Sequence, residues 1–446
     1  MDKARPNPFS RLVRPVMEIF GLSRALAIVV VTLVLLLFFA AIFWFFYSAP
    51  PHTITMTSGA PGSSFQANAE KYRELLARKR VKLKVLSSEG SLQNLQRLGD
   101  PSVAVDIGFV QGGITNGTGR MKLESLGSVT YQPLMIFYRG SNSVSLLSAF
   151  KGKRLDIGPP GSGTRALAKT LLELNEIEVD GSTTIVDSEG GDPGKGLLDG
   201  TVDAVFLMGD SASPQVMRRL LRSPSVRLFS FSQADGYTRR VSYLNKLEIP
   251  RGAIDFGEDI PAQDVYVMAP TVELVARAGL HPALCDLLIE AAQEVHGSAS
   301  LMRRKGEFPA PLEHDYAISS EASRYYKSGK SFLYRTLPFW MASVVNRVLV
   351  VFVPLVVVLI PGLRAVPWLL KLRMKLLIYR WYRALMVVER ELLVPLTPPQ
   401  REQLLVRLGE IEQAVNKMKV PASFADQFYG LRGDITFVRS RLTQGK

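Results

Sequence analysis

The feature that most constrains this chain is an apolar run from Ala25 to Tyr47. Its 23 residues carry no charge, and at 1.5 Å per residue a helix of that length crosses a hydrocarbon core of about 30 Å. The run is too long for the core of a signal peptide, and it ends in aromatic residues rather than in a small-residue cleavage site. We therefore expect a transmembrane helix at 25–47 that is retained as an anchor.

A second apolar stretch runs from 337 to 363, interrupted by Asn346, Arg347 and Pro354. A charge at the bilayer centre is costly, but Arg347 lies nearer one end of the stretch, from which a long side chain reaches the interface. The alternative is that Arg347 contacts a partner's transmembrane helix or an anionic lipid headgroup. In either case the stretch predicts a second transmembrane helix.

The positive charge of the chain lies mostly at its two ends. Residues 1–24 hold five basic and two acidic side chains, and residues 364–446 hold 15 basic and seven acidic side chains. Because basic residues flank transmembrane helices on the cytoplasmic side, both termini are expected in the cytoplasm of a bacterium and residues 50–336 in the periplasm. The charge thus indicates a two-pass inner-membrane protein that contacts membrane lipid, and not a nucleic-acid partner.

Metal, redox and disulfide chemistry are not expected. Cys285 is the one cysteine, so no internal disulfide or CxxC motif exists. The four histidines are not spaced as metal ligands; they are His52, His281, His296 and His314. We expect no metal and no cofactor.

The motifs that could indicate an enzyme are incomplete. Residues 158–163 have the spacing of a phosphate-binding loop, but Thr164 and Arg165 replace its lysine and hydroxyl residue. Residues 209–211 lack the GxSxG elbow of esterases, and Asp203 and Asp210 form no recognisable carboxylate pair. The sequence therefore predicts a protein that is not an enzyme.

The segment between the two apolar runs alternates strand-like and helix-like patterns. Strands are predicted at 54–57, 82–86 and 103–110, with helices at 65–79 and 91–98 between them. This order requires right-handed crossovers and a mostly parallel sheet with helices on its faces. The fold class is therefore α/β.

Three Gly/Ser-rich loops precede predicted helices in this segment, at 58–64, 87–91 and 158–164. Ligands of open α/β sheets bind beyond the carboxyl ends of the strands, and the N–H groups at helix starts favour an anion such as a carboxylate. Ordinary helix capping also explains any one such loop. Their recurrence in order favours a single converging site.

At these loops the sequence resembles the TAXI family, the solute receptors of a class of tripartite ATP-independent periplasmic (TRAP) transporters. The matching stretches occur in family order between about residues 52 and 320: 57–65, 88–95, 105–111, 157–164 and 200–206. The resemblance implies a two-lobed periplasmic-binding-protein-like fold, with one lobe at about 52–138 and 231–320 and the other at about 139–230. It also implies hinge closure around a small organic anion, such as glutamate, a 2-oxo acid or a dicarboxylate.

The resemblance assigns the ligand-binding residues by position. They are Ser58, Gly59, Ser63, Ser64, Phe65, Gly90, Ser91, Asn94 and Gln111 in one lobe, and Pro160, Gly161, Ser162, Gly163 and Thr164 in the other. The family often has tyrosine where Phe65 stands, so one hydroxyl contact is missing.

The tether and the C-terminal segment resemble a membrane-bound subgroup of the family. Residues 364–446 are expected to be a small helical tail, with a basic amphipathic helix at 365–393 and further helices at 400–417 and 423–442. The tail either docks on a protein or lies on anionic lipid. The expected partner is a TRAP-type permease or another inner-membrane protein. The alternative function is a sensor that transmits lobe closure through the second span to a cytoplasmic partner.

Overall fold

The computed structural model describes residues 24–47, 49–114, 122–140, 142–179, 181–187, 192–312, 315–394, 397–418, 420 and 424–444. These residues form two compact units. One unit is residues 49–346, and the other combines the chain before 49 with the chain from Arg347 onward. The basic segment 1–23, His314 and Ser423, on which predictions were made above, lie outside the described residues.

The first lobe of the 49–346 unit is an α/β layer around a largely parallel core. Its strands are β1 (Thr53–Thr57), β2 (Lys82–Leu86), β3 (Ile107–Gln111) and β4 (Leu123–Tyr131), and its helices are α3 (Ser64–Arg78), α4 (Ser91–Gly99), α9 (Pro282–His296) and α10 (Ser320–Ser328). Strand β1 lies between β2 and β3 and is parallel to both. Residues 65, 69, 72 and 76 are the buried positions of α3, and their spacing places them on one face of the helix, against the sheet.

The predicted βαβαβ order is confirmed, with one shift. Strand β3 begins at Ile107, whereas the apolar pattern predicts a strand from residue 103. The backbone N–H and the carboxylate of Asp106 both bond to Thr55, with Thr55 N donating to Asp106 Oδ2 over 2.7 Å. Val105 N also bonds to Val103 O within a turn. The Asp106 carboxylate takes up the Thr55 N–H and the bond at Val103 turns the chain, so the regular pairing with β1 begins at Ile107.

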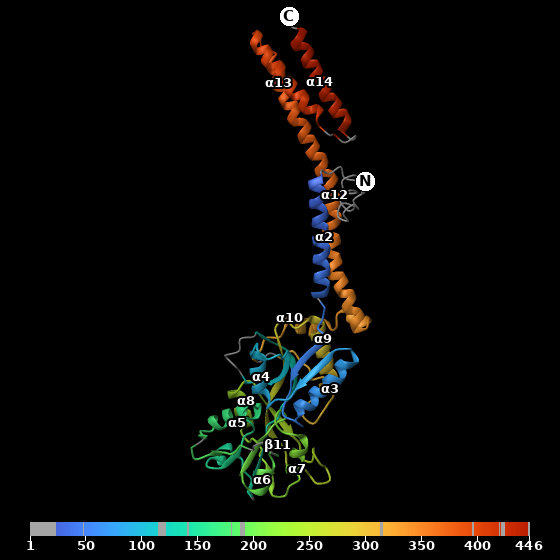
Figure 1. Ribbon diagram of the computed structural model, residues 1–446. Coiled ribbons are helices and arrows are strands. Elements are labelled where there is room, and N and C mark those ends of the chain that lie inside the picture. The colour runs from blue at the N-terminus through green and yellow to red at the C-terminus, as the bar shows by residue number, and fades with distance from the viewer. Residues whose placement is uncertain are drawn as a thin grey trace, which may run out of the picture. The chain divides into compact units, whose positions relative to one another are not determined.

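The second lobe is built on a five-stranded sheet in the order β7-β6-β8-β5-β9. Its strands are β5 (Met135–Arg139), β6 (Arg154–Asp156), β7 (Thr184–Ile185), β8 (Ala204–Leu207) and β9 (Val226–Leu228), and its helices are η1 (Leu147–Phe150), α5 (Gly163–Leu174), α6 (Lys195–Asp199), α7 (Pro214–Leu221) and α8 (Ala234–Arg240). Phe150 packs edge-to-face on Phe206 and Phe229 in its core. Each lobe thus has its own sheet and core, as expected for the predicted two-lobed fold (Figure 1).

The lobes are joined by two adjacent crossings. Strand β11 (Val265–Arg277) pairs through its first half with β10 (Leu244–Ile249) and through its second half with β3 and β4. Beside it, residues 132–134 connect β4 to β5, and Leu134 N bonds to Met268 O over 2.8 Å. Two neighbouring connections of this kind let two lobes rotate about a short axis.

These crossings differ from the predicted lobe limits. Residues 135–138 belong to the second lobe because β5 pairs with β8 and β9. Residues 231–268 also pack with the second lobe, through core side chains such as Phe231, Leu244 and Met268. The chain therefore crosses near 133 and again near 270. The predicted lobe boundaries differ because the boundaries depend on which strands pair, and a local sequence pattern does not show strand pairing.

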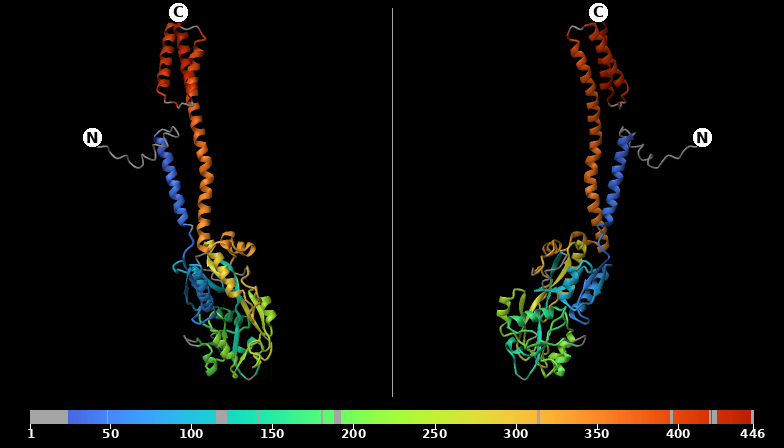
Figure 2. Two further views of the ribbon diagram at one scale, coloured as in Figure 1. Left: turned by 90° about the vertical axis from the view of Figure 1, so that its right-hand side faces the viewer. Right: turned by 60° about the vertical axis from the view of Figure 1, so that its left-hand side comes forward.

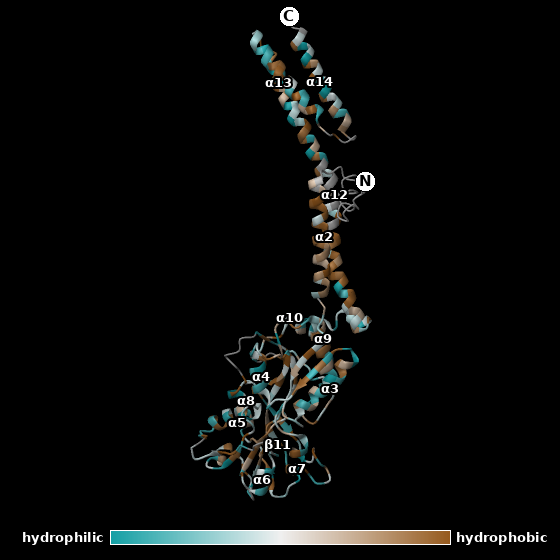
Figure 3. Cartoon of the chain, in the orientation of Figure 1, coloured by the Kyte–Doolittle hydropathy of each residue, from teal (hydrophilic) through white to brown (hydrophobic). Residues whose placement is uncertain are grey.

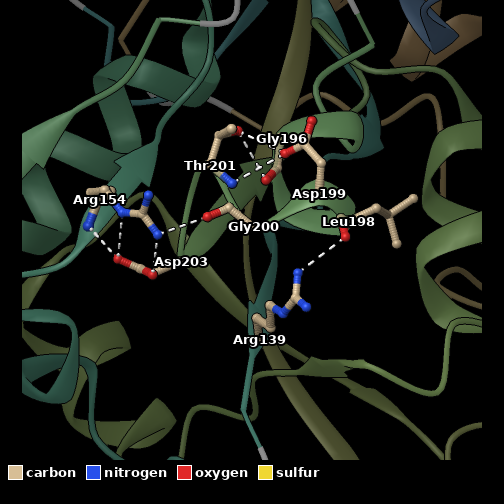
Figure 4. A network of polar contacts seen from close by, with 8 residues as sticks. All are labelled: Arg139, Arg154, Gly196, Leu198, Asp199, Gly200, Thr201 and Asp203. Atoms are coloured by element: carbon tan, nitrogen blue, oxygen red, sulfur yellow. Dashed lines mark hydrogen bonds and ion pairs between the residues drawn. The ribbon is translucent and has the colours of Figure 1, made fainter.

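The turn before β8 is held by a network of side chains (Figure 4). Arg154 donates to the Asp203 carboxylate and to Gly200 O, and Arg139 donates to Leu198 O over 3.1 Å. Gly200 has a φ of +81° and closes helix α6. The family-like stretch 200–206 therefore forms a structural turn and a core strand of the second lobe.

Two helices of the described chain are long and apolar enough to cross a membrane. They are Ala27–Tyr47 of α2 (Arg24–Tyr47), with mean hydropathy 3.0, and Phe339–Gly362 of α12 (Phe339–Glu391), with mean hydropathy 2.6. Both are coloured as hydrophobic over these stretches in Figure 3, and they lie side by side in the views of Figure 2. The Arg347 guanidinium lies 4.9 Å from the ring centre of Phe45 on α2, a cation–π contact that holds this charge within the helix pair.

Helix α12 has no break between the apolar stretch and the basic segment that follows. It is one helix of 53 residues, about 80 Å long at 1.5 Å per residue. The separate helix predicted at 365–393 is therefore the C-terminal half of α12. Pro354 and Pro361 lie within it, as is tolerated in apolar helices whose neighbours compensate for the lost bonds.

The C-terminal segment folds as three packed helices. Helices α13 (Pro398–Asn416) and α14 (Ala425–Gln444) share a core cluster with the end of α12. Its buried members include Leu385 on α12, Leu408 on α13 and Ile435 on α14. The helices predicted at 400–417 and 423–442 correspond to α13 and α14.

Leu408→Ala tests this packing. Leu408 is fully buried, so its truncation is expected to lower the unfolding free energy of the three-helix cluster by about 2–5 kcal/mol. The measurement is differential scanning calorimetry of the purified full chain, with the exposed residue change Val406→Ala as control. The transition of the 49–346 unit is expected to stay in place, and a shift of both transitions together would contradict the division into two units.

Candidate interlobe binding site

The predicted loops follow strands β1, β2 and β6 and lead into helices α3, α4 and α5. Ser63 caps α3 by accepting from Gln66 N, and Ser162 caps α5 by accepting from Arg165 N. Gly90 precedes α4 with a φ of +139°, a conformation that side chains with a Cβ rarely adopt. Two of the three loops thus contain the ordinary hydroxyl cap that was the alternative to a ligand site.

The loops of the two lobes contact each other directly. Gly161 N donates to Glu89 Oε2 over 2.7 Å, and Gln93 N donates to Gly161 O over 3.0 Å. From strand β3, Gln111 Nε2 donates to Gly163 O over 2.8 Å. The loop before α5 in the second lobe therefore lies on the loop before α4 in the first, with both lobes closed on one another.

A buried carboxylate, Asp210, stands at the centre of this contact. It follows β8, and its Oδ2 accepts from Gly163 N (2.5 Å) and Ser91 N (3.4 Å), which begin α5 and α4. Its Oδ1 accepts from Thr164 Oγ1 over 2.8 Å, and that hydroxyl also contacts Ser211 Oγ. The helix-start N–H groups predicted to bind a ligand anion thus bind a carboxylate of the protein itself.

Two glycines permit this close approach. A Cβ on Gly90 would lie 2.5 Å from Asp210 Oδ2, and a Cβ on Gly59 would lie 2.9 Å from Asp210 O. Ala60 N donates to Asp210 O and Phe65 N to Gly209 O, each over 3.2 Å. The loop after β8 is therefore held against the first predicted loop by backbone contacts and against the other two by the Asp210 side chain, and no space is left for a side chain at residues 59 and 90.

Other predicted site residues have their polar atoms engaged within the first lobe. Asn94 accepts from Thr57 Oγ1 and donates to Ser58 O and Phe109 O. Ser58 Oγ donates to Leu86 O. Phe65 is buried in the core, with its ring centre 5.3 Å from that of Phe109. These contacts stabilise the βα loops of the lobe.

The remaining predicted residues lie at or near the contact between the lobes. Ser64 lies against the backbone of the loop after β8, since a Cβ on Gly209 would be 3.3 Å from Ser64 Cβ. Ser91 Oγ accepts from Gln111 N over 3.3 Å. Pro160 is exposed, whereas the four residues after it are buried. The structure thus places these residues along the contact between the two lobes. This contact, here called the seam, is formed by the loops at 58–64, 87–91 and 158–164 and by the loop after β8.

Buried polar atoms without a partner identify a further part of this seam. Among the described residues, Gln111 Oε1, Ser88 Oγ and both amide atoms of Gln132 form no hydrogen bond. Gln111 pairs with Val272 of β11, and Gln132 N bonds to Pro270 O on the other side of β11. Because 270 and 272 lie on one face of their strand, both amides lie on the same face of the sheet, about 10 Å apart across β11.

At the end of β3, Gln111 Nε2 reaches Gly163 O of the second lobe. Burying an unpaired amide costs free energy unless a ligand or water completes it. The arrangement can therefore bind a small polar molecule between the crossings and the loop before α5.

Asp210, Glu89 and Gln132 were not among the residues predicted for the binding site. Asp210 directly follows an apolar strand, and residues at the carboxyl ends of strands in α/β sheets commonly face a ligand. This position in the sequence is the signal by which Asp210 could have been predicted. Gln132 carries no local signal, because its role depends on the crossing beside β11.

The pH dependence of stability tests the environment of Asp210. Burial raises the pKa of the Asp210 carboxyl, while hydrogen bonds from Thr164, Gly163 and Ser91 oppose the rise. The folded state then binds the proton more tightly than the unfolded chain, so this group's stabilisation is lost as pH rises from about 4 through the folded pKa. Asp210→Asn is expected to lack this loss. The measurement is the unfolding free energy of both forms across that pH range, and parallel curves would contradict it.

Comparison with known proteins places this architecture in context. The aliphatic sulphonate binding protein SsuA of Escherichia coli is 13% identical, with 55% of this chain and 69% of that chain covered and a TM-score of 0.33. The substrate binding protein of an amino acid ABC transporter is 12% identical (55% and 92% covered, TM-score 0.32), and the Synechocystis PCC6803 CcmR regulatory domain is 11% identical (55% and 96% covered, TM-score 0.35).

A family model matches a segment that begins within α3 and ends within α9, and that includes Glu89, Gly163 and Asp210. It is the model of the NMT1-like family, and it matches residues 66–292, just over half of the 446 residues. The chain belongs to the NMT1-like family.

Proposed function

We propose that this protein is a membrane-tethered extracytoplasmic receptor for a small organic acid. The observation that carries the proposal is the convergence of loops from both lobes on Asp210, beside the unpartnered amide of Gln132 and the unpartnered Oε1 of Gln111. A site between two lobes that rotate about paired crossings encloses its ligand when the lobes close.

The proposed topology has both termini in the cytoplasm and residues 50–336 in the periplasm. It is supported by the two apolar helices and by the basic residues beyond their other ends. Two tethers hold the receptor near a membrane partner and raise its effective concentration there.

Within the class of small organic acids, the site favours one that also carries an ammonium group, such as glutamate. The N–H groups of Ser91 and Gly163 suit a ligand carboxylate, and in the structure they donate to Asp210. When a ligand carboxylate takes these donors, the displaced Asp210 carboxylate is left beside the ligand. An ammonium group on the ligand would then neutralise it, whereas the 2-oxo group of a 2-oxo acid would leave its charge without a partner.

The partner proposed for transport is a TRAP-type permease, as the resemblance to the TAXI receptors implies. The alternative is a sensor, and one observation favours it: α12 is a single helix from Phe339 to Glu391. A continuous helix transmits a displacement at its first turn to the three-helix cluster. If the protein is a sensor, a signalling protein is expected to copurify with it only while residues 392–446 are present, whereas copurification of a permease without them supports transport.

Calorimetric titration of the full chain with glutamate and with a 2-oxo dicarboxylate of the same length tests the ligand assignment. Glutamate is expected to bind more tightly. Asp210→Asn is expected to weaken glutamate binding at least about thirtyfold, the effect of removing one partner of a buried charge pair, and to strengthen binding of the 2-oxo acid. Gly163→Val is expected to abolish both, because its side chain would overlap the Gln111 amide.

Asp203→Asn is the matched control for this experiment. Asp203 pairs with Arg154 at the edge of the second lobe, so its replacement is expected to leave both affinities unchanged. Unchanged binding in Asp210→Asn would place the ligand elsewhere. No binding of any organic acid by the folded wild type would overturn the receptor proposal.

A further inference from the structure

A cavity lies in the first lobe, at the end where the chain joins its apolar helices. It has a volume of about 320 Å³ and is formed by the end of α3, by α9, by α11 (Phe332–Thr336) and by the first residues of α12. Residues 78–80 and Lys330 supply its basic side chains, and Tyr334 and Trp340 are among its aromatic ones. This volume is within the range of sites that bind small molecules or headgroups.

The net charge of the cavity is positive. Its two acids are already paired, Asp286 with Arg324 (2.6 Å) and Glu290 with Lys330 (2.5 Å). Lys79 and Arg80 are exposed, and no ion pair within the described chain includes either of them. Two cations beside neutralised acids leave an anion-binding surface.

Arg80 stands where the backbone would prefer glycine. Its φ is +63°, and the turn has the bonds of a Schellman motif, from Val81 N to Leu76 O and from Arg80 N to Ala77 O. Glycine is the usual residue at this helix end because a Cβ is strained there. An arginine at the position places a charge at the cavity rim despite that strain.

Both apolar segments join the lobe beside this cavity. Phe339 and Trp340, which line it, are the first residues of α12 and of the apolar stretch. On the other side, Lys82 N bonds to His52 O over 2.8 Å, five residues after the end of α2. Trp340 is half exposed, as is common for aromatic residues at a membrane interface.

From these observations we propose that the cavity binds the phosphate of an anionic phospholipid headgroup, with Arg80 and Lys79 as the recognising cations. The assignment rests on the proposed topology, which places this end of the lobe at the periplasmic membrane surface. A bound headgroup would fix the orientation of the lobe at that surface.

The test uses the full chain reconstituted in vesicles of equal phosphatidylglycerol and phosphatidylcholine, followed by native mass spectrometry of the retained lipids. Wild type is expected to retain phosphatidylglycerol preferentially. Arg80→Gly and Arg80→Gln are each expected to reduce that preference roughly fivefold, the contribution of one basic residue at an anionic lipid surface. Arg239→Gln, which removes an exposed arginine of the second lobe, is the matched control and is expected to change nothing.

Thermal stability separates recognition from a structural role. Arg80→Gly is expected to unfold at the same temperature as wild type or higher, because glycine relieves the strained turn, while still losing lipid. Loss of stability with unchanged lipid preference in both variants would overturn the proposal. Displacement of the lipid by glycerol phosphate at comparable concentration would also overturn it, by showing a site for a soluble phosphate ester.

Labelling with a membrane-impermeant maleimide separates this proposal from the topology on which it rests. The exposed-site variant Glu258→Cys is expected to react from outside the cell, while the buried Cys285, with its pKa raised by burial to about 12, stays unmodified. Reaction of residue 258 without any phosphatidylglycerol preference means that the headgroup proposal alone fails. Absence of the reaction in intact cells means that the topology fails as well.

Discussion

The contact on which the two-lobed unit depends is the buried Asp210 carboxylate between the starts of α4 and α5. Removing an ionised carboxylate from water costs several kcal/mol, and hydrogen bonds to charged groups return about 1.5–3 kcal/mol each. Gly163 N, Ser91 N and Thr164 Oγ1 provide three such bonds, and they come from both lobes. Gly163 and Thr164 belong to the same lobe as Asp210, so the bond from Ser91 N is the one of the three that joins the lobes.

The same contact explains the glycines around Asp210, and the two crossings determine how the lobes lie relative to each other. Gly59 and Gly90 leave room for the loop that carries Asp210. Strand β11 pairs with β10 through its first half and with β3 through its second half, so the relative position of the lobes is set by one strand and by the segment at 132–134. Gln111 and Gln132 flank that strand, and a ligand between them would lie where a small rotation changes its surroundings most.

The sequence predicted the fold class and the order of elements well because these depend on local chemistry. Apolar periodicity gives α3 and α4, and Gly/Ser turns mark the ends of β1, β2 and β6. The role of each residue within the candidate site was harder to predict from the sequence. Ser63 and Ser162 are helix caps and Asn94 is a buried structural amide, because neighbouring donors and acceptors in the same lobe engage these polar groups. Their residue types fit a ligand contact equally well.

By itself, the sequence determined the apolar helices, the α/β alternation and the loops at which the lobes meet, since each follows from residues adjacent in the chain. The tertiary structure alone decided which groups meet across those loops. Asp210 reaches Gly163 over a separation of 47 residues and Ser91 over 119. Pairing over such distances is fixed by sheet order and by the two crossings. No local pattern carries that information.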